Sequence, residues 1–259
     1  MKLTALTTSL PIPLPAAIDT LVGLGFDWID VPPTAARSAV RERIQSHNVK
    51  IACVGLEREM PRPFDLASLD RAARRAAVDY FCSAIEATAE LAAPVGYITP
   101  PQETDDAIKA AWCASLVELG DYAQRCGVEV AVEHFPQRLV PTGAATLSLL
   151  AELDHPALKL LVDIGHCLIS NERPEELIAA AGRRFAYIHF DDNDGRSDLH
   201  WPLLTGRLTE QQLLQTIAAL QACGYDRGLC LELNPDQDTP VDNLQQGKLV
   251  LERLLAANA

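Results

Sequence analysis

Short apolar runs alternate with longer amphipathic stretches along almost the whole chain. A run of four to eight apolar residues is typical of a buried strand, whereas apolar residues spaced three or four positions apart over ten or more residues are typical of a helix. The apolar runs predict eight strands: residues 3–8, 26–31, 49–56, 95–99, 128–133, 158–163, a strand that starts near Phe185 and gives way to a loop at Asp191, and 229–232. The amphipathic stretches predict eight helices: residues 16–24, 34–48, 66–92, 104–126, 144–153, 174–181, 209–223 and 241–257.

Helix boundaries are marked by capping and turn residues. Thr34 is a candidate N-cap, and Gly25, Gly127 and Gly224 follow predicted helix ends. A proline-bearing loop passes through Arg62 and Pro63. Regular alternation of strands and helices predicts a parallel sheet, and eight such units in 259 residues predict a (β/α)8 TIM barrel, with residues 1–259 as a single domain. An open doubly wound sheet is the alternative, but the glycine-rich phosphate turn usual after its first strand is missing here.

The amino-acid composition limits the classes of binding partner that are expected. The formal net charge is −13 and no basic cluster is present, so nucleic acid is not an expected partner. No apolar segment is long enough to cross a bilayer, and prolines interrupt the apolar N-terminus where a signal peptide would need continuity. The seven cysteines include no C-x-x-C pair and mostly lie in apolar segments, which predicts reduced core residues in a cytoplasmic protein.

Acidic and histidine side chains stand at the ends of four consecutive predicted strands. They are Glu133, Asp163, His189 and Glu232. A solvent-exposed loop would explain any one of these residues taken alone. However, an unpaired charge directly after an apolar run is energetically costly, and all four residues hold equivalent positions. Active sites of such barrels lie at the carboxyl ends of strands about 4.8 Å apart, so the four side chains can converge on one ion. Three carboxylates and one imidazole suit Mn²⁺, Mg²⁺ or Co²⁺ better than a structural Zn²⁺.

His166 lies three residues after Asp163, separated by Ile164 and Gly165. Gly165 allows the chain to leave the strand sharply, so His166 can turn back over the ion and donate to a substrate oxygen. His134 directly follows Glu133, and strand alternation points it away from the site toward a core hydrogen bond.

Together these residues resemble the xylose isomerase-like TIM barrel superfamily, and in particular its sugar phosphate isomerase/epimerase branch. The resemblance rests on Glu133, Asp163-x-x-His166, His189 with Asp192-Asn193-Asp194-Gly195 behind it, Asp198-x-His200, and Glu232. It implies that Glu133, Asp163, His189 and Glu232 hold one divalent metal, with Mn²⁺ first and Mg²⁺, Co²⁺ or Zn²⁺ as alternatives. It further implies that Glu133 and Glu232 exchange a proton with a sugar carbon. We expect four residues to bind substrate: His166, Arg196, Asp198 and His200.

The chain departs from the family pattern at two places. Endonuclease IV, a relative with three zincs, has two further histidines after its third and fourth strands, and residues 53–57 and 97–101 contain none. A second metal at Asp198 and His200 stays an open alternative. The usual family loop also has two glycines after the position of His200, and here Leu204 replaces the first while Gly206 remains.

These observations predict a metal-dependent isomerase or epimerase that moves a proton next to the carbonyl of a small ketose or polyol-type substrate. The rival predictions are a dehydratase of inosose or dehydroshikimate type, an endonuclease IV-like phosphodiesterase, and a sugar-binding barrel without turnover. The sequence leaves open which substrate is used, whether it is phosphorylated, and whether the chain forms a homo-oligomer.

Overall fold

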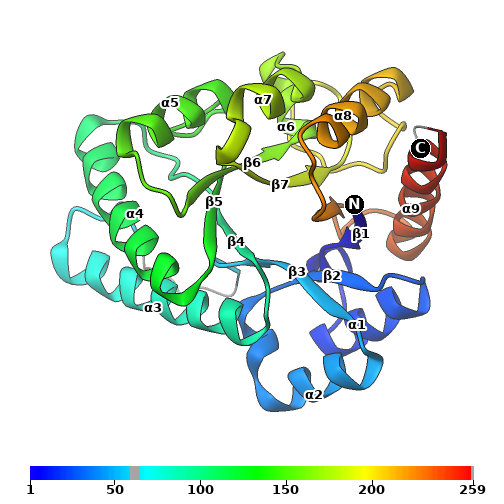
Figure 1. Ribbon diagram of the computed structural model, residues 1–259, viewed down its shortest axis with the longest axis horizontal. Coiled ribbons are helices and arrows are strands. Elements are labelled where there is room, and N and C mark those ends of the chain that lie inside the picture. The colour runs from blue at the N-terminus through cyan, green and yellow to red at the C-terminus, as the bar shows by residue number, and fades with distance from the viewer. Residues whose placement is uncertain (59–64, 258–259) are drawn as a thin grey trace.

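Eight parallel strands form the centre of the molecule, and helices surround them (Figure 1). The computed structural model describes residues 1–58 and 65–257, so the predicted loop through Arg62 and Pro63 lies outside the described residues. The strands are β1 (Lys2–Ala5), β2 (Trp28–Val31), β3 (Lys50–Gly55), β4 (Val95–Ile98), β5 (Glu129–Glu133), β6 (Leu158–Asp163), β7 (Phe185–Phe190) and β8 (Gly228–Leu231). The α-helices are α1 (Leu14–Gly23), α2 (Ser38–His47), α3 (Arg71–Glu90), α4 (Asp106–Cys126), α5 (Gly143–Leu153), α6 (Ile164–Ser170), α7 (Pro174–Ala181), α8 (Glu210–Ala222) and α9 (Pro240–Ala257).

The sheet follows the chain order, β1-β8-β7-β6-β5-β4-β3-β2. A parallel bridge between Leu6 and Asp30 joins the two ends of this order and brings β1 beside β2. The predicted single-domain (β/α)8 TIM barrel is therefore the observed architecture. None of the helices in the described parts of the chain combines the length and the apolar character that a bilayer crossing requires.

Alternation along each strand divides the core into two parts. One apolar cluster fills the space between the strands and the helices, and it includes Ile29, Val31 and Ile188. A smaller cluster lies inside the barrel and includes Tyr97, Tyr187 and Cys230. Because side chains alternate with a period of two, an inward residue at a strand end lies one layer above the inward residue two positions earlier.

Three predicted elements begin or end elsewhere in the structure, and one helix was not predicted. The first strand is shorter than predicted, because Thr7–Ser9 form a 3-10 turn. The prediction that Thr34 caps a helix is wrong: Pro33–Ala36 form a 3-10 turn, and α2 begins at Ser38 without a side-chain cap. The third helix starts later than predicted, because the Asp70 carboxylate accepts the N–H groups of Ala72 and Ala73 and so fixes its first turn. The short helix α6 was not predicted.

Candidate metal centre and active site

The four predicted metal ligands converge at the carboxyl end of the barrel. Each of Glu133, Asp163, His189 and Glu232 offers a ligand atom, and these atoms lie within 4.8 Å of one another. His189 Nδ1 is central to the group: it lies 2.5 Å from Glu232 Oε2, 3.1 Å from Glu133 Oε1 and 3.9 Å from Asp163 Oδ2. All four side chains are almost inaccessible to solvent.

Strand register explains why these side chains meet. Asp163 pairs directly with His189 between β6 and β7, and Glu133 pairs with Leu161, two residues before Asp163. Glu232 directly follows β8, and its N–H donates to the carbonyl oxygen of Phe190 at 3.3 Å. Neighbouring parallel strands therefore present their last inward side chains to one point.

Burial and mutual repulsion perturb the acids of this cluster. Burial raises the pKa of Asp163 to about 7, and the nearby Asp191 carboxylate adds to that increase. Burial also raises the pKa of Glu133. Burial would lower the pKa of His189, but Glu232 and Glu133 outweigh it and raise that pKa well above its ordinary value. Such a concentration of buried acids around one base is stabilised by a cation.

A second group of side chains lies beside the first. His166 Nε2 and His200 Nε2 lie 3.2 and 3.1 Å from Asp198 Oδ1. His200 Nδ1 lies 3.1 Å from Asp191 Oδ2. Asp191 in turn lies close to Asp163, so it connects the second group to the first. The structure thus brings three of the four predicted substrate-binding residues together next to the metal cluster.

His166 reaches this place by a route that the sequence did not predict. It lies in the first turn of α6, where its backbone N–H donates to Asp163 Oδ1 at 2.8 Å. Its Nδ1 lies 2.8 Å from the carbonyl oxygen of His134, which directs Nε2 toward Asp198. Gly165 is helical rather than sharply turned, and its N–H donates to Asp191 Oδ1 at 3.0 Å. A Cβ at Gly165 would lie 2.3 Å from that carboxylate oxygen, so the close approach of Asp191 requires glycine.

A sequence model of the xylose isomerase-like TIM barrel matches residues 18–254. The chain belongs to the xylose isomerase-like TIM barrel family. Fructoselysine 3-epimerase of Shigella flexneri is 24% identical over 235 residues, covering 83% of this chain and 84% of the relative.

Solved structures of similar proteins agree with the fold. The crystal structure of a D-tagatose 3-epimerase-like protein has a TM-score of 0.82 at 20% identity and covers all of both chains. D-allulose 3-epimerase from Methylomonas sp., solved in complex with D-allulose, has a TM-score of 0.79 at 19% identity and covers 98% of this chain and 96% of that one. At these sequence identities, the similarity shows that the proteins share the barrel fold.

The loop after β7 is organised by Asp192. Its Oδ1 accepts the N–H groups of Asn193 and Leu208, at 2.8 and 2.9 Å, and its Oδ2 accepts that of Gly206 at 2.7 Å. Its backbone also exchanges two hydrogen bonds with Trp201. These contacts close the loop around the segment that carries Asp198 and His200, so Asp192 is a structural residue of the site.

The two positions at which the family loop has glycine impose different requirements on the residue in this chain. Leu204 adopts a left-handed backbone with φ 65°, a conformation that glycine tolerates without strain. Gly206 needs the absence of a side chain instead, because a Cβ would lie 2.3 Å from the carbonyl oxygen of Asn193. The departure at Leu204 therefore leaves a locally strained residue in this loop.

Sequence analysis missed Arg58 and Tyr97. The Arg58 guanidinium donates to Glu232 Oε1 at 2.7 Å and to the Tyr97 hydroxyl at 3.1 Å. The Tyr97 ring packs edge-on against His189, with the ring centroids 4.9 Å apart. The absence of histidines after β3 and β4 was visible in the sequence, but the position of Arg58 was not, because it lies three residues beyond β3.

Predictions were also made for His134 and Arg196. His134 is fully buried and its Nε2 accepts the N–H of Asp163 at 3.3 Å, which confirms the predicted core hydrogen bond. Burial lowers the pKa of His134 to about 3, so the ring is neutral and can accept. Arg196 is exposed, and its backbone N–H donates to Asp194 Oδ1 at 2.8 Å, so its contact with substrate stays a prediction.

Proposed function

We propose that this protein is a divalent-metal-dependent sugar epimerase or isomerase that moves a proton next to the carbonyl of a small ketose or polyol-type substrate. The observation that carries the proposal is the placement of two glutamates, Glu133 and Glu232, against the same nitrogen, Nδ1, of one buried imidazole at the mouth of the barrel. The 3-epimerase names of the sequence relative and the solved structures support the same class of reaction.

The donor set fits a divalent cation. Three carboxylates and one imidazole nitrogen face a common point, and Asp163 Oδ2 is buried without a hydrogen-bond partner among the described residues. Oxygen-rich sets of this kind suit Mn²⁺, which we propose first, with Mg²⁺, Co²⁺ or Zn²⁺ as alternatives. An ion held by Glu133, Asp163, His189 and Glu232 would polarise a substrate carbonyl and offset the negative charge that develops on its oxygen.

The pKa values of the two glutamates are shifted in opposite directions. Burial would raise the pKa of Glu232, but His189 and, more weakly, His200 and Arg58 outweigh it and lower that pKa well below the ordinary value. Glu133, by contrast, has its pKa raised, first by burial. Because a protonated His189 causes most of the lowering, the two glutamates are inequivalent in the metal-free protein.

We propose that one of the two glutamates takes the proton from the carbon next to the carbonyl. The electron pair of that C–H bond forms the carbon–carbon double bond of an enediolate while the carbonyl electron pair moves onto its oxygen, and the other glutamate returns a proton to the opposite face or to the neighbouring carbon. His166, held by Asp198 and by the carbonyl oxygen of His134, is placed to donate to a substrate hydroxyl or carbonyl oxygen. Asp198, His200 and Arg196 complete the proposed substrate contacts.

A small-molecule screen tests this function directly. Ketoses and their 3-epimers would be incubated with the protein and Mn²⁺ in deuterium oxide, and products followed by NMR. The proposal expects epimer formation with deuterium at the epimerised carbon. Formation of an ultraviolet-absorbing enone from inososes, without epimers, would identify a dehydratase. Binding of a sugar without turnover or hydrogen exchange under any of the four metals would contradict the enzyme assignment.

The proposed partner is a small sugar or polyol, and we propose a cytoplasmic location and no nucleic-acid or membrane partner. The net charge of −13 supports the exclusion of DNA, because a duplex is held by clustered basic side chains. Residues 53–57 and 97–101 also contain neither of the two histidines that an endonuclease IV-like site would have after the third and fourth strands. Cleavage of abasic DNA at about 1 s⁻¹ or faster would overturn this exclusion.

A further inference from the structure

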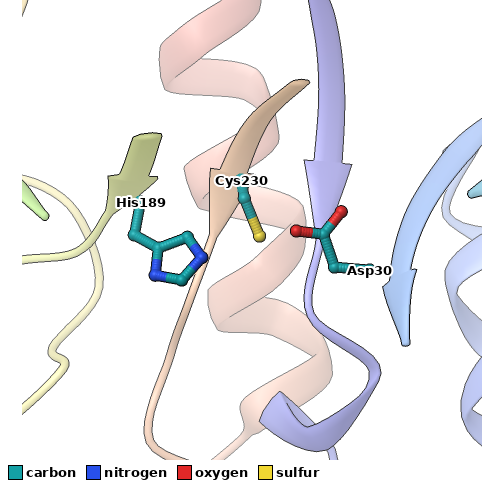
Figure 2. A group of neighbouring side chains, drawn as sticks. All are labelled: Asp30, His189 and Cys230. Carbon is teal, nitrogen blue, oxygen red and sulfur yellow. The ribbon is translucent and has the colours of Figure 1, made fainter. Parts of the chain in front are cut away.

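A polar group lies inside the barrel, one layer below the candidate metal centre. Asp30 on β2 and Cys230 on β8 face the ring of His189 on β7, and all three side chains are fully buried. One ligand-type atom of each lies within 4.8 Å of the others. Figure 2 shows the three side chains pointing toward one another, with the Cys230 sulfur drawn between the imidazole and the carboxylate.

Strand alternation explains why Asp30 is inside the barrel. Its neighbours Ile29 and Val31 pack in the outer core between strands and helices, so Asp30 must face inward. Cys230 and Tyr187 occupy the same layer, two residues before Glu232 and His189 respectively. The register between β2 and β3 shifts between Ile29 and Asp30, an irregularity of the kind that re-aims a side chain.

Asp30 has the Tyr187 hydroxyl and the Cys230 thiol as polar neighbours. Its Oδ1 accepts the hydroxyl of Tyr187 at 2.8 Å, and that hydroxyl lies 3.2 Å from Thr4 Oγ1. Its Oδ2 has no hydrogen-bond partner among the described residues. A fully buried carboxylate with a free oxygen is costly, so an electrostatic partner for this oxygen is expected.

The two ring nitrogens of His189 also differ in their contacts. Its Nδ1 faces Glu133 and Glu232, whereas its Nε2 is buried and, in the described part of the chain, has no hydrogen-bond partner. A neutral imidazole has one N–H donor and one acceptor nitrogen. Metal-binding histidines almost always give the second ring N–H to a carboxylate, a carbonyl or water, which fixes the tautomer and the ring orientation.

We propose that Asp30, with Cys230 beside it, is a positioning residue for His189. The carboxylate stabilises the His189 tautomer that carries its proton on Nε2. This tautomer leaves the Nδ1 lone pair for the ion at Glu133, Asp163 and Glu232. This inference rests on the proposed function, because it concerns a ligand of the proposed ion. A separate ion in the lower group is disfavoured, because it would have to share the His189 ring and give up all of its water inside the barrel.

Substitutions at Asp30 separate positioning from packing. Asp30→Asn keeps the size and polar atoms of the side chain but removes its charge, whereas Asp30→Leu removes both the charge and the polar atoms and suits the apolar interior. Cys53→Ala is the matched control, because Cys53 pairs with Asp30 in register and is equally buried, but does not belong to the group around His189. Mn²⁺ affinity would be measured by chelator competition, together with the melting temperature of each variant.

The proposal expects Mn²⁺ affinity to fall in the order wild type, Asp30→Asn, Asp30→Leu, with the last about 10- to 100-fold weaker than the wild type. A purely structural role would instead make Asp30→Leu the better substitute and leave affinity near that of Cys53→Ala. Affinity of a folded Asp30→Leu variant within about threefold of that control would overturn the proposal. Two divalent ions per chain, one of them lost in Cys230→Ser, would also overturn it.

A spectroscopic measurement on the wild type does not depend on how the variants fold. In protein with ¹⁵N-labelled histidine, His189 should show a slowly exchanging Nε2–H resonance both metal-free and with Zn²⁺, identified by its loss in His189→Gln. Absence of that resonance would overturn the inference. If the wild type shows the resonance and the affinity order but epimerises no ketose, the proposed function fails while the positioning of His189 stands.

Discussion

Arg58 and Glu232 meet across the mouth of the barrel, with the guanidinium Nη2 2.7 Å from the carboxylate Oε1. We predict that Arg58→Met lowers kcat/KM by about 10- to 100-fold, because a hydrogen bond to a charged group contributes about 1.5–3 kcal/mol. Steady-state kinetics with saturating Mn²⁺ would measure the change. Arg58→Lys is the control that retains charge without the forked geometry, and it should recover part of the loss. Unchanged kinetics in Arg58→Met would show that Glu232 holds its position without this contact.

Glutamine substitutions test the proton transfer. Glu232→Gln retains shape and an oxygen ligand but removes the base, so we predict retention of much of the metal and a loss of about 10²–10⁴ in turnover. Glu133→Gln should behave similarly. Solvent deuterium incorporation into substrate and product would be measured for the wild type and both variants. Undiminished turnover in both variants would exclude the assigned roles.

His166 separates substrate contact from metal binding. We predict that His166→Ala keeps the ion at the main cluster while KM rises or carbonyl polarisation falls, because its Nε2 faces Asp198 rather than the four ligands. Metal content per chain, measured together with substrate binding, distinguishes the two effects. Loss of a second ion from His166→Ala would instead favour a metal at His166, Asp198 and His200.

Asp192 carries the loop that holds the second group. We predict that Asp192→Ala destabilises the protein by several kcal/mol, because three backbone N–H groups lose a carboxylate acceptor and each orphaned group costs about 1–3 kcal/mol. Chemical denaturation would measure the loss. Asp192→Asn retains one side-chain oxygen and should lose less. Substrate affinity should fall more than metal affinity, because the main cluster lies on the strands.

The fold and the main cluster could be predicted because both follow from strand periodicity. Glu133 and Asp163 end strands, His189 lies one residue before the end of β7, and Glu232 directly follows β8, so a count along the chain places them at the same rim. The helix α6 could not be predicted in the same way. Asp163 is both a ligand-type residue and the N-cap of α6, and α6 is only seven residues long, too short for a clear amphipathic pattern.

The supporting residues were harder to recognise for two different reasons. Arg58 acts from a loop, where no periodic rule fixes the direction of a side chain. Asp30 does lie on a strand, and its position between outward-facing Ile29 and Val31 was a readable signal of an inward acid. That signal was missed because sequence analysis followed only strand ends, whereas Asp30 supports the site from the layer beneath.

The raised pKa of His189 couples the uptake of an ion to the release of a proton. Nδ1 faces Glu232 and Glu133, which raise this pKa and hold a proton on Nδ1, and that proton must leave before the nitrogen can coordinate. Metal affinity should therefore rise with pH, by up to about tenfold per unit for one proton, until the pH passes that pKa. Titration calorimetry in buffers of different ionisation enthalpy would count the released protons, and His189→Gln should release fewer. The protein would then hold its ion less tightly in an acidified compartment, so the proton concentration itself becomes a competitor for the site.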